Sequence, residues 1–176
     1  PEVIAEVAKE PTVSALFADD EEGLCLINST GGNSKWELLS VTVDSGAAES
    51  VIPENKCAQY PTKDTEKSMS GMQYQGADGT KIPNLGEKAV SGVTQDGVHT
   101  RMNFQVCPVT KALGSVSKMT KQGHRVVFDS EEYGEGSYIE NKMTGSRKYL
   151  REHNGIYILD VWVKPYPVSY THLTLP

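Results

Sequence analysis

The sequence is poor in several features that would each indicate a class of protein. Aromatic residues make up only 7% of the 176 residues, and the three cysteines, at positions 25, 57 and 107, are odd in number and widely spaced. This spacing favours neither a disulfide framework nor a zinc knuckle, so we expect a reducing, intracellular and cytoplasmic setting. The four histidines have no metal-ligand spacing either, so neither a metal nor a cofactor is expected.

The charges and apolar runs argue against two further classes. The formal net charge is -6 and the lysines and arginines are scattered. The chain therefore lacks the basic stripe of a nucleic-acid binder, and no direct nucleic-acid contact is expected from this segment. No apolar run approaches the length of a membrane span, and no basic-then-apolar leader opens the chain, so no membrane partner is expected.

Turn-forming residues and short apolar runs are what the sequence does contain. Its 16 glycines and 9 prolines separate many short β-like segments, which predicts an all-β fold, a small barrel or sandwich, with one short helix. Composition divides the chain into four segments. They are a disordered linker over 1–21, a β domain over 22–129, a further β-rich segment over 130–166, and a tail over 167–176 that resembles translated adapter sequence and is treated as non-native.

Hairpins dominate the predicted secondary structure. The predicted pairs are 24–27 with 36–43, 72–74 with 81–82, and 89–93 with 98–106; single strands are predicted at 51–53, 124–128, 137–141, 147–151 and 156–163. The Asp78-Gly79 pair is a strong hairpin signal, and we expect φ > 0 at both residues. A helix is predicted over 115–122, because Ser115 can cap its start and Gly123 can end it.

One short motif carries the candidate chemistry. Asp44 ends an apolar strand, and the run Asp44-Ser45-Gly46-Ala47 then predicts a tight loop in which Gly46 lets the backbone approach closely. The Ser45 hydroxyl is expected to bond to neighbouring backbone. An aspartate that merely caps a turn at a strand end is the simpler interpretation of such a motif. Two such carboxylates a few Å apart, however, share one proton and can hydrolyse a peptide bond.

Three separated features resemble the retropepsins, a family of aspartic proteases. The run 41–47 followed by 50–52 resembles their first active-site loop, 77–82 looks like their flap hairpin, and 112–114 with the helix and strand that follow is similar to their second loop and C-terminal helix. These features cover about residues 22–129. The later run from Leu113 to Leu159 also looks like copia-type retrotransposon polyproteins, in which such a segment leads toward the integrase.

The resemblance implies a retropepsin-like barrel with one half-site per chain. Asp44 would be the catalytic residue, Ser45, Gly46 and Ala47 its supporting loop, Ala77, Asp78, Gly79 and Thr80 the flap over the substrate, and Leu113 and Gly114 the second loop. The sequence has a single Asp-Ser-Gly, so the second carboxylate would come from a homodimer partner. The implied substrate is a polypeptide, the element's own polyprotein, and no cofactor or metal is implied.

Two departures from the family pattern keep other interpretations open. Ala48 stands where retropepsins commonly have an acidic residue, and Ser115 follows the glycine where Arg or Asp is common. Both favour an alternative in which a catalytically inactive retropepsin-like fold serves as a polyprotein spacer or dimerisation module. A small peptide-binding β domain with no proteolytic role is a third interpretation.

Overall fold

Twelve strands and two short helices make up the described part of the chain, residues 36–165, in the computed structural model. In chain order they are β1 (Glu37–Asp44), β2 (Val51–Pro53), α4 (Glu66–Met69), β3 (Gln73–Gln75), β4 (Lys81–Pro83), β5 (Gly86–Thr94), β6 (His99–Cys107), β7 (Ala112–Ser115), α5 (Val116–Lys121), β8 (His124–Val127), β9 (Tyr138–Asn141), β10 (Arg147–Tyr149), β11 (Arg151–His153) and β12 (Ile156–Val163). The prediction of an all-β chain is confirmed. The predicted linker over 1–21, the strand at 24–27 and the tail over 167–176 lie outside the described residues.

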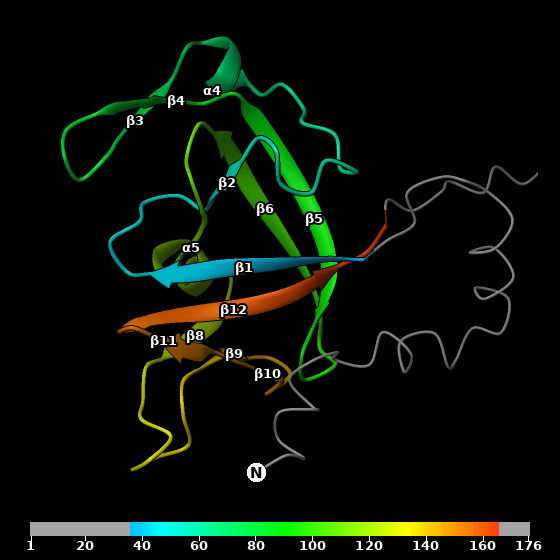
Figure 1. Ribbon diagram of the computed structural model, residues 1–176, viewed down its shortest axis with the longest axis vertical. Coiled ribbons are helices and arrows are strands. Elements are labelled where there is room, and N and C mark those ends of the chain that lie inside the picture. The colour runs from blue at the N-terminus through cyan, green and yellow to red at the C-terminus, as the bar shows by residue number, and fades with distance from the viewer. Residues whose placement is uncertain (1–35, 166–176) are drawn as a thin grey trace, which may run out of the picture. The chain divides into compact units, whose positions relative to one another are not determined.

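Six of these strands form a sheet that closes on itself. The order is β1-β7-β2-β6-β5-β12, and β12 pairs with β1 as well as with β5. Strand β1 runs antiparallel to β12 from Glu37 opposite Val163 to Val43 opposite Tyr157, and the two lie side by side across the middle of Figure 1. Because the sheet is closed, β1 and β12 each have one face toward the inside of the sheet and one face toward the outside.

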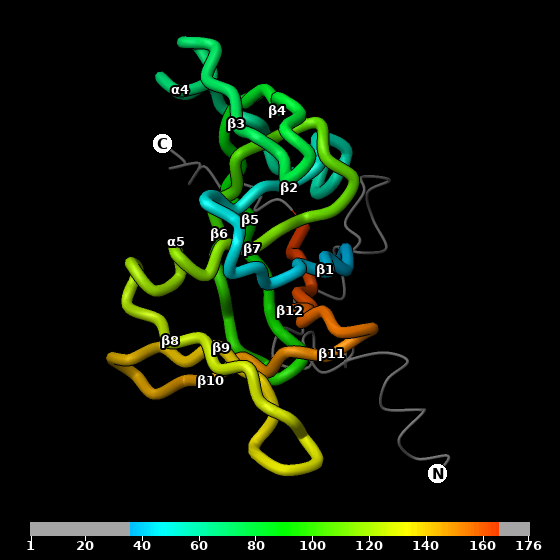
Figure 2. Tube along the Cα trace, turned by 90° about the vertical axis from the view of Figure 1, so that its left-hand side faces the viewer, coloured from blue at the N-terminus to red at the C-terminus, as the bar shows by residue number. Residues whose placement is uncertain are grey.

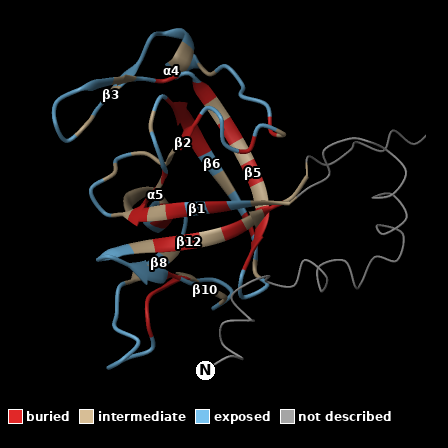
Figure 3. Cartoon of the chain, in the orientation of Figure 1, coloured by how far each residue is buried: buried red, intermediate tan, exposed pale blue. Residues whose placement is uncertain are grey.

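The core fills the inside of this closed sheet. In β1 the alternate residues Leu39, Val41 and Val43 are at most 5% exposed, as the two-residue period of a strand requires. The facing residues of β12 (Leu159, Val161 and Val163) are at most 2% exposed. Figure 3 shows buried residues alternating with less buried ones along β1 and β12, whereas the β3–β4 hairpin is mostly exposed or intermediate.

The expected boundary at residue 129 does not separate compact units. Residues Glu37–Lys164 form one compact unit, because β12, from the segment 130–166, pairs with both β1 and β5. The rest of that segment contributes β9 and β10, which form a three-stranded sheet with β8. The later segment is therefore part of the same fold as the strand that ends at Asp44.

Glycines with positive φ lie in the tight turns of the chain, but one expectation about these turns was wrong. In the β3–β4 hairpin only Gly79 has positive φ (84°), so the expectation of φ > 0 at Asp78 was wrong. The Gly79 amide donates to the Gly76 carbonyl and the Gly76 amide to the Thr80 carbonyl. This is a three-residue loop that ends in a left-handed glycine. Asn154 and Gly155, both with positive φ, form the two-residue turn between β11 and β12.

Both short helices have defined caps. Helix α5 begins after Ser115, whose hydroxyl accepts a hydrogen bond from the Lys118 amide, and Gly123 follows it with φ 85°, which confirms the predicted helix. Helix α4 was not predicted. Its signal is the pair Thr65 and Ser68, which form a reciprocal capping box, but serine at the third position is a weaker indication than glutamate.

Candidate functional site

Asp44 is the last residue of β1, and one oxygen of its carboxylate is fixed by the loop that follows. The Gly46 amide donates to Asp44 Oδ1 over 2.7 Å, and this is the only hydrogen bond to the carboxylate within residues 36–165. A Cβ on residue 46 would lie 3.3 Å from that same oxygen, so glycine gives the amide an unhindered approach. The half-buried carboxylate is thus oriented through Oδ1, while Oδ2 is left for other contacts.

The next residues lead the chain outward and back. Ser45 and Gly46 are exposed and Ala47 is half-buried before the chain re-enters the sheet at β2. The expected bond from the Ser45 hydroxyl to neighbouring backbone is not found in the described part of the chain. The loop is therefore not held by Ser45, and its restraints come from elsewhere.

The predicted second loop lies directly beside the Asp44 loop. Strand β7 runs parallel to β1, with Gly114 opposite Val43 and Ser115 opposite Asp44. A Cβ on Gly114 would lie 2.8 Å from the Met119 methyl and 3.1 Å from a Val41 methyl. The absence of a side chain at Gly114 therefore allows α5 to pack closely against β1.

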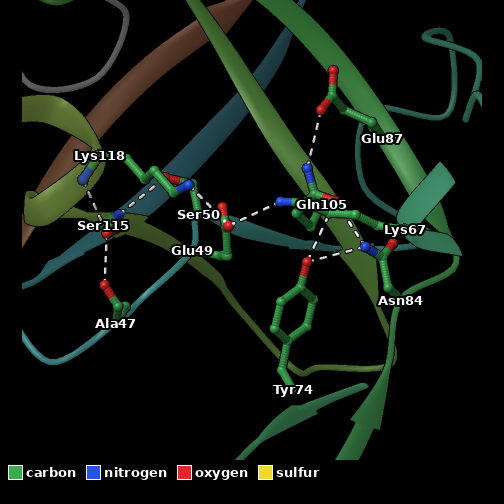
Figure 4. A network of polar contacts seen from close by, with 10 residues as sticks. All are labelled: Ala47, Glu49, Ser50, Lys67, Tyr74, Asn84, Glu87, Gln105, Ser115 and Lys118. Atoms are coloured by element: carbon green, nitrogen blue, oxygen red, sulfur yellow. Dashed lines mark hydrogen bonds and ion pairs between the residues drawn. The ribbon is translucent and has the colours of Figure 1, made fainter. Parts of the chain in front are cut away.

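Ser115 joins this second loop to the Asp44 loop. Its side chain is fully buried, and its hydroxyl donates to the Ala47 carbonyl over 2.6 Å while it accepts from the Lys118 amide over 3.3 Å. Its own amide donates to the Ser50 hydroxyl over 3.0 Å. Figure 4 shows this residue between α5 and the loop that leaves β1. The Ser115 hydroxyl therefore satisfies one amide at the start of α5 and one carbonyl in the loop that follows Asp44.

Glu49 adds a charged connection on the same loop. Its carboxylate oxygen Oε1 lies 2.9 Å from Lys118 Nζ and 3.2 Å from Lys67 Nζ, and its side chain is 17% exposed. Burial raises the pKa of Glu49, but the hydrogen bonds and charges of the two lysines outweigh it and hold that pKa below its ordinary value. The carboxylate thus stays ionised and links the loop to α5 and to α4.

The predicted flap is a real hairpin whose root is fixed and whose tip is exposed. At the root, the buried Asn84 side chain donates to Gln105 Oε1 over 2.8 Å and to the Tyr74 hydroxyl over 3.0 Å; these residues are drawn in Figure 4. Burial, with the charge of Glu49 second, raises the pKa of Tyr74. The hairpin projects on the same side of the molecule as the loop after β1 (Figure 1).

Among residues 36–165, the tip of this hairpin forms hydrogen bonds only within the hairpin itself. The Thr80 amide and hydroxyl donate to the two carboxylate oxygens of Asp78 over 2.9 and 2.7 Å, and these bonds lower the pKa of Asp78. Ala77 and Gly79 complete the exposed turn. Within residues 36–165, no hydrogen bond or ion pair joins residues 77–80 to Asp44. The structure therefore brings 44–47 and 113–114 together and leaves 77–80 apart from them.

Several residues that hold the loop were not singled out from the sequence. Glu49 and Lys118 carry no motif, and Ser50 was named only within the run that resembles the first loop of the retropepsins. The contacts that join Glu49 to Lys118 and Ser50 to Ser115 are between residues distant in sequence. The one available signal was the helix cap predicted at Ser115. No family model, curated protein or solved structure matches the chain. Among residues 36–165 no helix is long and apolar enough to cross a membrane, and the same residues contain no group of three or more candidate metal ligands.

Proposed function

We propose that this chain is one half of a homodimeric aspartic endopeptidase, with Asp44 as the carboxylate that each subunit contributes. The observation that carries the proposal is the placement of Asp44. It ends a core strand, Gly46 fixes one of its oxygens over 2.7 Å, and Ser115 ties its loop to a neighbouring strand. The resemblance of three separated sequence features to the retropepsins supports the same conclusion.

The reaction needs a second carboxylate opposite the first. In a two-fold dimer, Asp44 and Asp44 of the partner subunit would face each other across the symmetry axis. Two carboxylates a few Å apart hold one proton between them, because they cannot both be ionised at low cost. The ionised one takes a proton from a water molecule, which attacks the peptide carbonyl, and the protonated one donates to the carbonyl oxygen.

The substrate in this proposal is an extended polypeptide, with the chain's own polyprotein as the natural candidate. Such a peptide would lie between the Asp44 loops and the two β3–β4 hairpins and would pair through its main chain as an added strand. The fixed root and the self-contained tip of the hairpin suit a lid, because the tip can move without breaking contacts to the sheet.

The direct test is cleavage of polyprotein or of a peptide library by the purified chain, with Asp44→Asn as the inactivating variant. We expect the variant to abolish cleavage and to unfold at the same urea concentration as wild type. Asp129→Asn is the matched control, because it makes the same chemical change at an exposed aspartate in the loop that follows β8. If Asp44→Asn cleaves as wild type does, Asp44 has no catalytic role.

Sharing of the site between two chains is tested by mixing wild type with Asp44→Asn protein under conditions of subunit exchange. Random pairing at equal amounts leaves about a quarter of the dimers with two wild-type Asp44 residues. Relative to the same total amount of wild-type protein, activity should therefore fall to about a quarter if two chains share the site. It should fall to about a half if each chain is active by itself. A stable dimer without cleavage of any substrate would instead favour a spacer or dimerisation module.

A further inference from the structure

A cavity separate from Asp44 lies between β6, α5 and the small sheet β8–β9–β10. Its volume is about 230 Å³, and its lining includes Thr100, His124, Ile139 and Lys148. Figure 2 shows α5 and the small sheet beside each other, next to β6. Glu49 and Ser50 also line the cavity, but Asp44 does not.

Two basic side chains reach the cavity from the inner face of the small sheet. Lys148 is the cross-strand partner of Ile139, and Ile139 is also the partner of Val126. Since alternate residues of a strand share a face, His124 lies on the same face as Val126 and therefore as Lys148. This inner face otherwise packs against the core through Ile139, which is 3% exposed.

Neither basic group is balanced by an acid. Lys148 Nζ donates one hydrogen bond, to Thr100 Oγ1 over 2.9 Å, and within residues 36–165 it forms no ion pair. The Nδ1 atom of His124 is buried and has no hydrogen-bond partner in the described chain. The Met119 backbone lies near that ring and favours its protonated form, but it makes no hydrogen bond of acceptable geometry with Nδ1.

The acids that border the cavity are already engaged. Glu49 pairs with Lys67 and Lys118, and Glu87 accepts a hydrogen bond from the Gln105 amide. Arg101, at the rim, forms no ion pair within the described residues either. Burial lowers the pKa of Lys148, and burial followed by the charge of Lys148 lowers the pKa of His124. Unpaired basic groups in such a position are costly, and a bound anion is one of the few arrangements that offsets the cost.

We propose that this cavity is a binding site for a small multiply charged oxyanion, a phosphate or a carboxylate. Lys148 donates to the anion with the hydrogens that Thr100 does not use, His124 donates through Nδ1, and Arg101 attracts the anion at the rim. The volume is below the roughly 300–1,000 Å³ of sites for drug-sized ligands, which suits a small anion rather than a nucleotide. The proposal does not depend on Asp44, so the two proposals can fail separately.

The test is calorimetric titration of the whole chain at low ionic strength with inorganic phosphate in one arm and citrate in the other. We expect saturable binding in at least one arm. Binding of phosphate alone assigns a tetrahedral oxyanion, binding of citrate alone assigns a carboxylate, and binding of both assigns a general oxyanion site. Lys148→Met should weaken the binding about tenfold or more, because a charge-assisted hydrogen bond is lost.

The matched control is Lys142→Met, which removes the same charge from an exposed position in the turn between β9 and β10. It should leave the affinity unchanged. If Lys148→Met fails to fold, amide chemical shifts of wild-type protein decide: Thr100 and Lys148 should move with the anion while Gly145 should not. Absence of saturable binding in both arms, or equal weakening by the two lysine variants, would overturn the proposal.

Discussion

Removal of β12 should unfold the whole closed sheet, although β12 lies beyond the segment that carries the active-site resemblance. Strand β12 pairs with β1 along seven residue positions, and three of the same residues, 161–163, pair with β5 on the other edge. A chain that ends at Asp129 would expose one edge of β1 and open the inside of the sheet to water. We therefore expect that chain to lack cooperative unfolding and the dispersed amide spectrum of a folded protein.

The stability lost with β12 can be estimated from three of its buried side chains. Leu159, Val161 and Val163 are at most 2% exposed, and burial of an aliphatic side chain of this size contributes about 1.5–3 kcal/mol. Together the three contribute roughly 5–9 kcal/mol. The total stability of a domain is only about 5–15 kcal/mol, so the loss of β12 alone removes most of it.

Urea unfolding followed by circular dichroism measures the effect with point variants as well. Leu159→Ala should cost about 2–5 kcal/mol. Ile156→Ala lies in the same strand, but at a position that is 36% exposed. It should change the free energy of unfolding by no more than about 0.5 kcal/mol. Protein concentration is held constant, because dimerisation would shift the midpoints. A chain ending at Asp129 that unfolds cooperatively at the wild-type midpoint would refute the reasoning, as would equal costs for the two alanine variants.

Two further predictions concern ionisation and reactivity. Because the pKa of folded Glu49 is lowered, its ionised form stabilises the fold above the ordinary carboxyl range, and this stability is lost as the pH falls through the folded value. The urea midpoint of wild type should therefore exceed that of Glu49→Gln near neutral pH and converge with it as the pH falls below the ordinary carboxyl range; a pH-independent difference would contradict the role of charge. Burial raises the pKa of Cys57 to about 12 and that of Cys107 to about 11, so peptide mapping after iodoacetamide treatment at pH 8 should find both unlabelled unless urea is present.

Local patterns predicted the pieces of this fold well, because each is determined by neighbouring residues. The alternation in β1 identifies its buried face, and Gly79 and Gly123 mark a hairpin loop and a helix end through their positive φ. The closure of the sheet was not predictable in the same way. Periodicity tells which face of β12 is buried, but it does not tell that β1 is the strand it pairs with.

The candidate site likewise has parts that the sequence predicts and contacts that it does not. The Asp44 motif and the glycine of the second loop are visible in sequence because each needs a particular residue type at one position. The contact of Glu49 with Lys118 is not visible, because many acid and base pairs in the chain are equally compatible with the sequence. Only the parallel pairing of β7 with β1 brings those two side chains together.

The departures at Ala48 and Ser115 change which residues hold the loop without removing its restraints. At Ser115, where the retropepsins that the sequence resembles commonly have Arg or Asp, a hydroxyl donates to the Ala47 carbonyl over 2.6 Å and accepts from the Lys118 amide at the start of α5. Glu49, the residue after Ala48, forms an ion pair with Lys118 over 2.9 Å. The Asp44 loop is therefore held within one subunit by Ser115 and Glu49, which lie at or next to the two positions where the sequence departs from the retropepsin pattern.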